Sequence, residues 1–139
     1  MAIKKDDLIK YFQDACKTEN NLSIGVEHEK FLFDSKSNKR INFETVTKVF
    51  NFLENFGWKP IKEKNKIVAL FKDNKSITLE PGNQIELSGA PLNSIHHNCR
   101  ESYEFLEELK KACKNFDLKM IASSFDPFSK LENVPKSPK

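Results

Sequence analysis

The stretch IGVEHEKFLF, residues 24–33, places two carboxylates inside a run of β-branched and aromatic residues that is typical of a strand. Successive side chains of a strand point to opposite faces, so Glu27 and Glu29 share one face. Val26 and Leu32 share the other face. Two carboxylates about 7 Å apart on one strand face repel each other unless a cation or water lies between them. The chemistry that this spacing suggests is the binding of a cation.

A second acidic pair lies in SITLEPGNQIELSGAP, residues 76–91. Its Pro81-Gly82-Asn83 is a turn signal between two runs with a period of two, which together predict a hairpin. In that hairpin Glu80 and Glu86 would lie near each other on the polar face. The other polar residues of that face are Thr78, Gln84 and Ser88, and the opposite face carries Ile77, Leu79, Ile85 and Leu87.

If the two polar faces meet, four carboxylates share one site: Glu27, Glu29, Glu80 and Glu86. A like-charge pair at ~4 Å costs about 4 kcal/mol at an effective dielectric constant of about 20, so such a site needs protons or cations. Ligands that are all oxygen atoms suit Mg²⁺ or Mn²⁺. The pattern also fits edge strands whose outward glutamates only keep the protein soluble, and it does not decide between the two.

Both motifs resemble those of a known enzyme family. IGVEHEKF, LEPGNQIELSGAP and the following Ile95-His96-His97 are similar, in this order and spacing, to the glutamate–cysteine ligases of plants and many bacteria. The resemblance implies ATP- and Mg²⁺-dependent joining of the γ-carboxyl of L-glutamate to L-cysteine through γ-glutamyl phosphate, the first step of glutathione biosynthesis. It also implies a fold similar to glutamine synthetase, with metals and substrates on the concave face of an antiparallel sheet.

The resemblance also assigns roles to residues of this chain. It makes Glu27, Glu29, Glu80 and Glu86 metal ligands. It places Gln84, Ser88 and Gly89 in the amino-acid pocket. It assigns no catalytic side chain and no residue for the ATP phosphates.

The chain departs from the family pattern in three positions and in length. Leu32 stands where the family usually has Gly, Asn83 replaces the second Gly of the turn, and Ile85 replaces Phe. Family enzymes are considerably longer, so the chain resembles an amino-terminal portion that supplies part of an active site. A non-catalytic domain that binds a metal or a partner is the alternative, and self-association through an exposed sheet face is a further possibility for such a piece.

The hydrophobic spacing predicts the elements around these motifs. Helices are expected over residues 6–17, 42–56 and 95–116, the first with Leu8, Ile9, Phe12 and Cys16 on its inner side. Further strands are expected at residues 58–62, 67–72, 76–80, 84–88 and 118–125. The expected class is α+β, a mainly antiparallel sheet with helices packed on one face. Residues 1–125 would form the amino-terminal part of the ligase domain, and the tail 126–139, rich in proline and lysine, a truncated connection with little that packs.

Composition narrows the class of protein. The 139 residues carry a formal net charge of +3, and the lysines are scattered, which does not favour a nucleic-acid groove. No apolar run approaches the roughly 20 residues that span a bilayer. No signal peptide is recognisable, and Asp6 and Asp7 argue against a transit peptide, so the cytoplasm is the expected compartment.

The remaining candidate ligands have structural interpretations. The three cysteines have no metal-binding spacing and are expected to be buried, reduced thiols: Cys16, Cys99 and Cys113. His28 alternates away from the glutamates and is expected to pack behind the sheet, and neither His96 nor His97 has a partner histidine at i+4.

Overall fold

The computed structural model describes residues 3–136. Its helices and strands, in chain order, are α1 (Lys5–Asp14), β1 (Glu27–Asp34), α2 (Phe43–Leu53), β2 (Lys59–Glu63), β3 (Lys66–Lys72), β4 (Lys75–Glu80), β5 (Gln84–Ser88), α3 (Ile95–Asn115) and β6 (Leu118–Ile121). Short 3₁₀ turns lie at Glu19–Asn21, Glu54–Phe56, Pro81–Asn83 and Leu131–Asn133.

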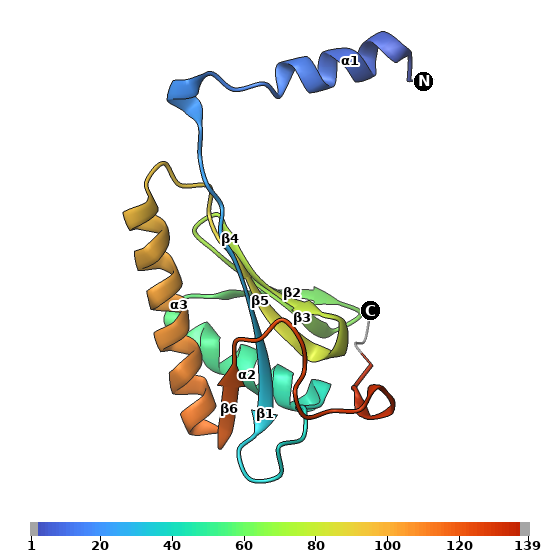
Figure 1. Ribbon diagram of the computed structural model, residues 1–139, viewed down its shortest axis with the longest axis vertical. Coiled ribbons are helices and arrows are strands. Elements are labelled where there is room, and N and C mark those ends of the chain that lie inside the picture. Colours follow the sequence, from blue (N-terminus) through green and yellow to red (C-terminus); the bar gives the residue numbers. More distant parts are fainter. Residues whose placement is uncertain (1–2, 137–139) are drawn as a thin grey trace.

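The strands form one six-stranded sheet in the order β2-β3-β4-β5-β1-β6, and every neighbouring pair is antiparallel (Figure 1). The predicted α+β class is confirmed. The predictions for β2 to β5 match within one residue, because alternating apolar and polar residues are bounded there by turn residues. The last strand ends at Ile121, four residues earlier than predicted, so β6 pairs with β1 only at residues 31–34 of β1.

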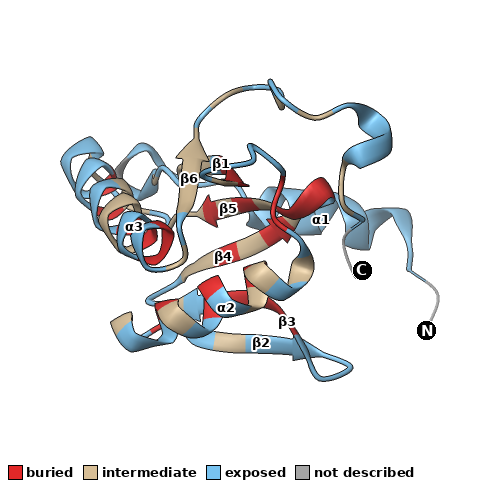
Figure 2. Ribbon diagram, turned by 90° about the horizontal axis from the view of Figure 1, so that it is seen from below, coloured by how far each residue is buried: buried red, intermediate tan, exposed pale blue. Residues whose placement is uncertain are grey.

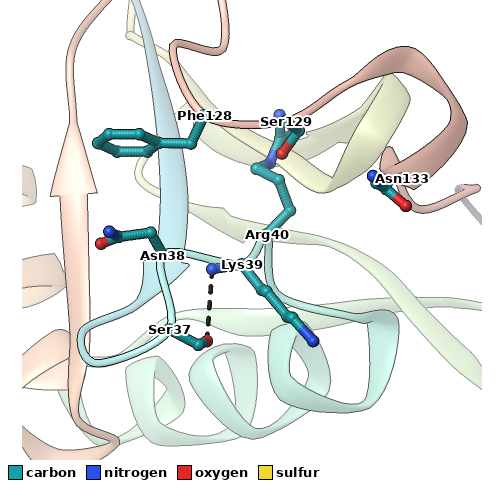
Figure 3. Close-up of a pocket in the computed structure, with 7 residues that line it drawn as sticks. All are labelled: Ser37, Asn38, Lys39, Arg40, Phe128, Ser129 and Asn133. Carbon is teal, nitrogen blue, oxygen red and sulfur yellow. Dashed lines mark hydrogen bonds between the residues drawn. The ribbon is translucent and has the colours of Figure 1, made fainter.

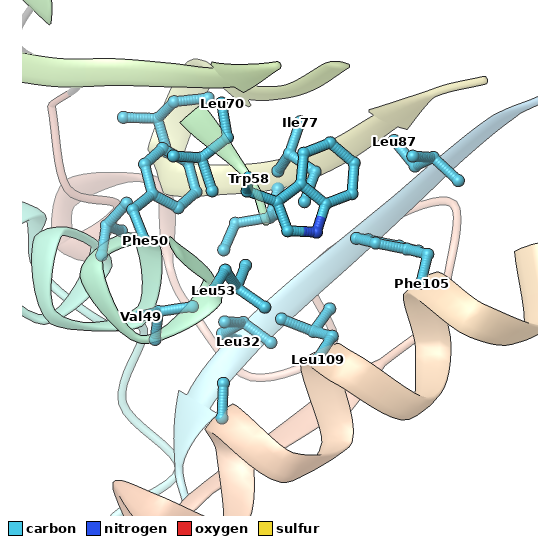
Figure 4. Packing of buried hydrophobic residues seen from close by; sticks show 14 of the residues in the cluster. Leu32, Val49, Phe50, Leu53, Trp58, Leu70, Ile77, Leu87, Phe105 and Leu109 are labelled. Atoms are coloured by element: carbon cyan, nitrogen blue, oxygen red, sulfur yellow. The ribbon is translucent and has the colours of Figure 1, made fainter. Parts of the chain in front are cut away.

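The hydrophobic core lies between the sheet and the helices α2 and α3, which lie on the same side of it (Figure 4). Figure 2 shows the buried positions concentrated along the central strands. Leu32, Leu87 and Leu109 are fully buried there. Leu32, which stands where the family usually has Gly, therefore fills the core and does not crowd the face that carries the glutamates.

Both ends of α3 and the start of α2 lie within one residue of their predicted positions, whereas α2 ends at Leu53, three residues early, and continues as the 3₁₀ turn Glu54–Phe56. The side chain of Asn42 accepts a hydrogen bond from the backbone N–H of Thr45 at 2.9 Å, and that of Ser94 accepts one from His96. Beyond α2, Gly57 ends the following 3₁₀ turn with φ +88°, a conformation that favours glycine. Within residues 3–136, no helix combines the length and the apolar character needed to cross a bilayer.

The first helix differs from its prediction. α1 ends at Asp14, and none of its residues is buried. Leu8 is 52% exposed and Phe12 is 70% exposed. Figure 1 shows α1 standing apart from the sheet, to which it is joined by an extended connection. The apolar stripe indicates that a helix forms, but it does not indicate what covers it.

The prediction for the cysteines is right for one and wrong for two. Cys113 is buried against the core, and burial raises the pKa of its thiol to about 11. Cys16 and Cys99 are exposed. Cys16 follows a helix that packs on nothing within the described chain. Cys99 lines the open groove between α3 and β1, beside Val26 and His28. Helical spacing alone therefore did not predict that these two thiols are exposed.

The contrast between β1 and α1 makes a testable prediction. Leu32→Ala should lower the free energy of unfolding by about 3 kcal/mol, because it leaves a cavity in a closed core. Leu8→Ala, on exposed α1, should change it by less than about 0.5 kcal/mol. Urea unfolding followed by circular dichroism measures both. Equal losses would contradict the separation of α1 from the core.

Candidate functional site

The two acidic motifs share one face of the sheet. β1 pairs with β5 so that Glu29 lies opposite Glu86, and Glu27 opposite Ser88. β5 pairs with β4 so that Glu86 also lies opposite Thr78, and Glu80 opposite Gln84. These seven residues form what we call the acidic face: Glu27, Glu29, Thr78, Glu80, Gln84, Glu86 and Ser88.

The predicted hairpin is confirmed, and its register refines one detail. Glu80 is a diagonal neighbour of Glu86 rather than its direct partner, since Glu80 pairs with Gln84. The direct neighbour with the same charge is Glu29. The apolar residues of β4 and β5 face the core, so strand alternation turns the acidic face away from α2 and α3.

Glu29 and Glu86 lie at an especially close kind of cross-strand position. The N–H of Gly89 donates to the carbonyl of Val26 at 2.8 Å, so Val26 and Gly89 form a hydrogen-bonded pair of this ladder. Hydrogen-bonded and non-hydrogen-bonded pairs alternate along an antiparallel ladder, so Glu29 and Glu86 form a non-hydrogen-bonded pair. Side chains are closest in such pairs, and like charges there are destabilising.

Polar side chains of the acidic face donate hydrogen bonds to three of its carboxylates. Gln84 Nε2 donates to Glu29 Oε2 at 2.8 Å, and Ser88 Oγ donates to Glu86 Oε1 at 2.8 Å. Thr78 Oγ1 donates to Glu80 Oε1 at 3.3 Å. Neither Glu29 nor Glu86 belongs to any ion pair of residues 3–136. Both carboxylates are hydrogen-bonded without an ion pair, although Glu29 also attracts the charge of the adjacent Lys30.

Gly89 lies where no side chain fits. A Cβ atom at this position would be 2.5 Å from Glu101 Oε1 and 2.8 Å from the carbonyl oxygen of Val26. Glu101, from α3, accepts a hydrogen bond from the N–H of Ala90 at 3.0 Å. The glycine therefore lets the end of β5 approach β1 and α3 closely. This packing explains the glycine independently of any substrate.

His28 and Lys30 lie on the side of β1 opposite to the acidic glutamates. His28 lines an apolar groove against α3 together with Tyr103 and Leu106, which matches its predicted placement. Burial and the charge of Lys30 lower the pKa of His28. Lys30 is 6% exposed, and its Nζ donates to the carbonyl of Glu29 at 3.1 Å. The other two histidines, His96 and His97, are exposed on the first turn of α3.

The acidic face fits half of a site for a hard divalent cation. Its donor atoms are carboxylate, hydroxyl and amide oxygens, which Mg²⁺ prefers, and its opposed glutamates form no ion pair within residues 3–136. Across residues 3–136, no three histidine, cysteine, aspartate or glutamate side chains come close enough to hold a metal by themselves. Mg²⁺ is commonly held by one or two carboxylates plus substrate phosphates, so Glu29 and Glu86 suit that arrangement.

Sequence reasoning missed Arg40. Its side chain is 2% exposed, and its Nη1 pairs with Asp126 Oδ2 at 3.0 Å. Its Nη2 donates to the carbonyl of Gly82, and its Cζ lies 4.4 Å from the ring centre of Phe31. Figure 3 shows Arg40 pointing toward Ser129, beside a cavity of about 510 Å³. The only available signal was that Arg40 is one of two arginines in a chain rich in lysine.

The tail also makes contacts that the sequence did not predict. The ring of Phe128 packs edge-on against that of Phe33, with centroids 5.1 Å apart. Burial alone would raise the pKa of Asp126, but hydrogen bonds from the N–H groups of Phe128 and Ser129 and from Arg40 outweigh it and lower the pKa to about 2. Residues 126–129 are thus fastened to the end of β1.

Comparison with known proteins agrees with the motifs. The model of a family described as glutamate-cysteine ligase family 2 matches residues 23–138. The chain is 35% identical over 138 residues to the chloroplastic glutamate–cysteine ligase of Arabidopsis thaliana. It is 36% identical, again over 138 residues, to the chloroplastic glutamate–cysteine ligase A of Oryza sativa subsp. japonica. Each alignment covers 99% of this chain but only 26% and 28% of these relatives, respectively, so the chain spans about a quarter of their length.

The opposition of Glu29 and Glu86 predicts a gain in stability when one charge is removed. In buffer with a chelator, Glu86→Gln should raise the free energy of unfolding by about 0.5 kcal/mol, and Glu29→Gln should add little once Glu86 is neutral. Glu104→Gln, on the exposed side of α3, is the matched control. Urea unfolding measures the unaltered chain, the two single variants, the double variant and the control. Additive gains would contradict a direct repulsion.

The Arg40–Asp126 pair predicts a dependence of stability on pH. Because the pKa of Asp126 is about 2 in the fold and 3.8 ordinarily, its contribution is complete above pH 3.8 and is lost as the pH falls toward 2. Asp126→Asn should therefore cost about 2 kcal/mol at neutral pH, less than a fully enclosed pair would. That difference from the unaltered chain should vanish near pH 2.

Urea unfolding at a series of pH values checks this, with Glu132→Gln on the exposed part of the same tail as the control. A cost for Asp126→Asn that stays constant down to pH 2 would show that the carboxylate charge is not what stabilises the tail.

Proposed function

Because the chain belongs to glutamate–cysteine ligase family 2, we propose that it supplies part of the active site of an ATP- and Mg²⁺-dependent glutamate–cysteine ligase. The substrates would be L-glutamate, L-cysteine and ATP, and the product would enter glutathione biosynthesis. The observation that carries the proposal is the opposition of Glu29 and Glu86 on the face of the sheet that faces away from α2 and α3.

In this proposal the acidic face binds divalent cations and borders the amino-acid pocket. Glu27, Glu29, Glu80 and Glu86 hold divalent cations. A bound Mg²⁺ would offset the negative charge of the ATP phosphates while the phosphoryl group moves to the γ-carboxylate of glutamate. The protein contributes carboxylates that are already oriented by strand pairing, so little reorganisation is needed.

The remaining residues of the face orient the carboxylates and border the amino-acid pocket. Gln84 and Ser88 each donate to a carboxylate, and either side chain can turn its remaining hydrogen-bonding atoms to a substrate. Gly89 would contribute backbone rather than a side chain. Its close packing against Val26 supports a rigid rim at this end of β5.

The chain forms one wall of such a site. It spans about a quarter of the length of the relatives, and the phosphate-binding groups would come from sequence that corresponds to the rest of them. The second candidate is a domain that binds a cation or a protein without chemistry. The exposed apolar side of α1 favours it, because that side offers a surface for another polypeptide.

A chimera tests the proposal. The stretch of the Arabidopsis relative that aligns with this chain is replaced by this chain, and ADP formation is measured with glutamate and cysteine present. Glu29→Gln and Glu86→Gln should each reduce turnover about 100-fold, because each removes charge that stabilises the transferring phosphoryl group. The isolated chain should form no ADP.

The control chimera carries Glu104→Gln and should keep its activity, since Glu104 is exposed on α3. Equal activity of the Glu29→Gln and Glu104→Gln chimeras would contradict a role for the acidic face. A chimera that binds the cation but never forms ADP would favour the second candidate.

A further inference from the structure

We propose that Arg40 is a positioning residue of the acidic face, which it orders by holding the turn between β4 and β5. One guanidinium joins three segments that are far apart in the sequence. It donates to the carbonyl of Gly82 in the turn, pairs with Asp126 of the tail at 3.0 Å and stacks on Phe31 of β1. This inference rests on the proposed function, since it concerns the same carboxylates.

A second hydrogen bond fixes the same turn. Asn83 Nδ2 donates to the carbonyl of Ile41 at 3.0 Å, and Asn83 is fully buried with φ +59°. Two adjacent residues, Arg40 and Ile41, therefore contact two adjacent residues of the turn. Because two bonds side by side prevent rotation about either one, the turn has a single orientation relative to the end of β1.

The turn is also enclosed from outside. A Cβ atom at Gly82 would lie 2.8 Å from Val134 Cγ1 and 3.3 Å from Arg40 Nη2. Gly82 itself has φ +72°. The carbonyl of Gly82 can reach the guanidinium because no side chain separates them.

The orientation of the turn sets the positions of the carboxylates. Glu80 immediately precedes the turn and Gln84 immediately follows it. Gln84 in turn donates to Glu29 at 2.8 Å. A shift of the turn would thus move Glu80 directly and Glu29 through Gln84.

Arg40 acts through these neighbours rather than on a ligand. Its side chain is 2% exposed, so a substrate or cation cannot reach it, and Asp126 neutralises its charge beside the acidic face. A lysine would keep the charge but would lose the planar fork that contacts Gly82 and Asp126 at once. Arg40→Lys therefore tests the contribution of the two simultaneous contacts apart from that of the positive charge.

The test measures Mn²⁺ affinity of the folded 139-residue chain by the paramagnetic resonance signal of unbound Mn²⁺. Arg40→Lys should weaken Mn²⁺ binding about tenfold, the effect expected when a residue that orients metal ligands is lost. Leu109→Ala is the matched control, since it removes a fully buried side chain of α3 without touching the turn. It should leave the affinity of the folded chain within about twofold of the original, although it destabilises the fold.

The result that would overturn the inference is an unchanged affinity in Arg40→Lys, or an equal loss in Leu109→Ala. If Arg40→Lys does not fold, Asn83→Gly takes its place. That variant keeps a turn with positive φ and removes only the bond to Ile41, and it should weaken Mn²⁺ binding as well. An unchanged affinity in this variant would equally overturn the inference.

Failure of the proposed function is recognised separately. If the unaltered chain binds no Mn²⁺, the metal role of the acidic face is wrong. The effect of Arg40 on the order of the turn is then tested by itself. Amide hydrogen exchange at Glu80 and Gln84 should then be faster in Arg40→Lys than in Leu109→Ala after each is corrected for global stability. Equal corrected rates would overturn the positioning role.

Discussion

Two like charges at the closest kind of cross-strand position, Glu29 opposite Glu86, are the constraint on which this structure depends. Such a pair costs up to about 1 kcal/mol. The other face of the same strands repays it, since full burial of a side chain such as Ile85 or Leu87 contributes about 1.5–3 kcal/mol. The apolar face therefore decides the register, and the glutamates are held opposite each other as a consequence. Binding a cation would turn this unfavourable contact into a favourable one.

The strands thus form the core with one face and present the carboxylates on the other, while contacts outside the strands orient the end of the hairpin. Strand pairing fixes which residues are opposite, but it does not fix how the hairpin end sits relative to β1. That is done by buried polar groups outside the strands: the Arg40 guanidinium and the Asn83 amide. The substitution of Asn for the usual glycine is explained here, because Asn83 adopts a left-handed conformation and adds a hydrogen bond that glycine lacks.

Local patterns were enough to predict the part of the fold that carries the glutamates. Period-two alternation around Pro81-Gly82-Asn83 identified β4, β5 and their shared polar face, and helical spacing with recognisable ends identified α2 and α3. The pairing of β1 with β5, which opposes Glu29 and Glu86, is non-local, so the sequence alone did not predict it. Periodicity left cation binding and a solubilising edge as two open interpretations, and the family resemblance is what assigned the four carboxylates as metal ligands.

The errors have a common physical cause. Arg40 and Asp126 are 86 residues apart in the chain, and no local pattern marks such a pair. The tail was expected to pack little because it is rich in proline and lysine, but an ion pair, an aromatic contact and a cation–π contact fasten it without an apolar stripe. Conversely, α1 has an apolar stripe but lies against nothing within residues 3–136. Amphipathic spacing reports a tendency to bury a surface, and the partner comes from elsewhere in the fold or outside it.

The two-sidedness of β5 limits how this region can change in evolution. Inserting or deleting one residue within Gln84–Ser88 would exchange its faces, sending a glutamate into the core and isoleucine or leucine into solvent. A change of two residues would preserve the faces but would slide Glu86 away from Glu29. Homologues that keep both the fold and a cation site should therefore differ here by substitution alone, with changes in length confined to the connections at β2–β3 and β3–β4 on the far side of the sheet.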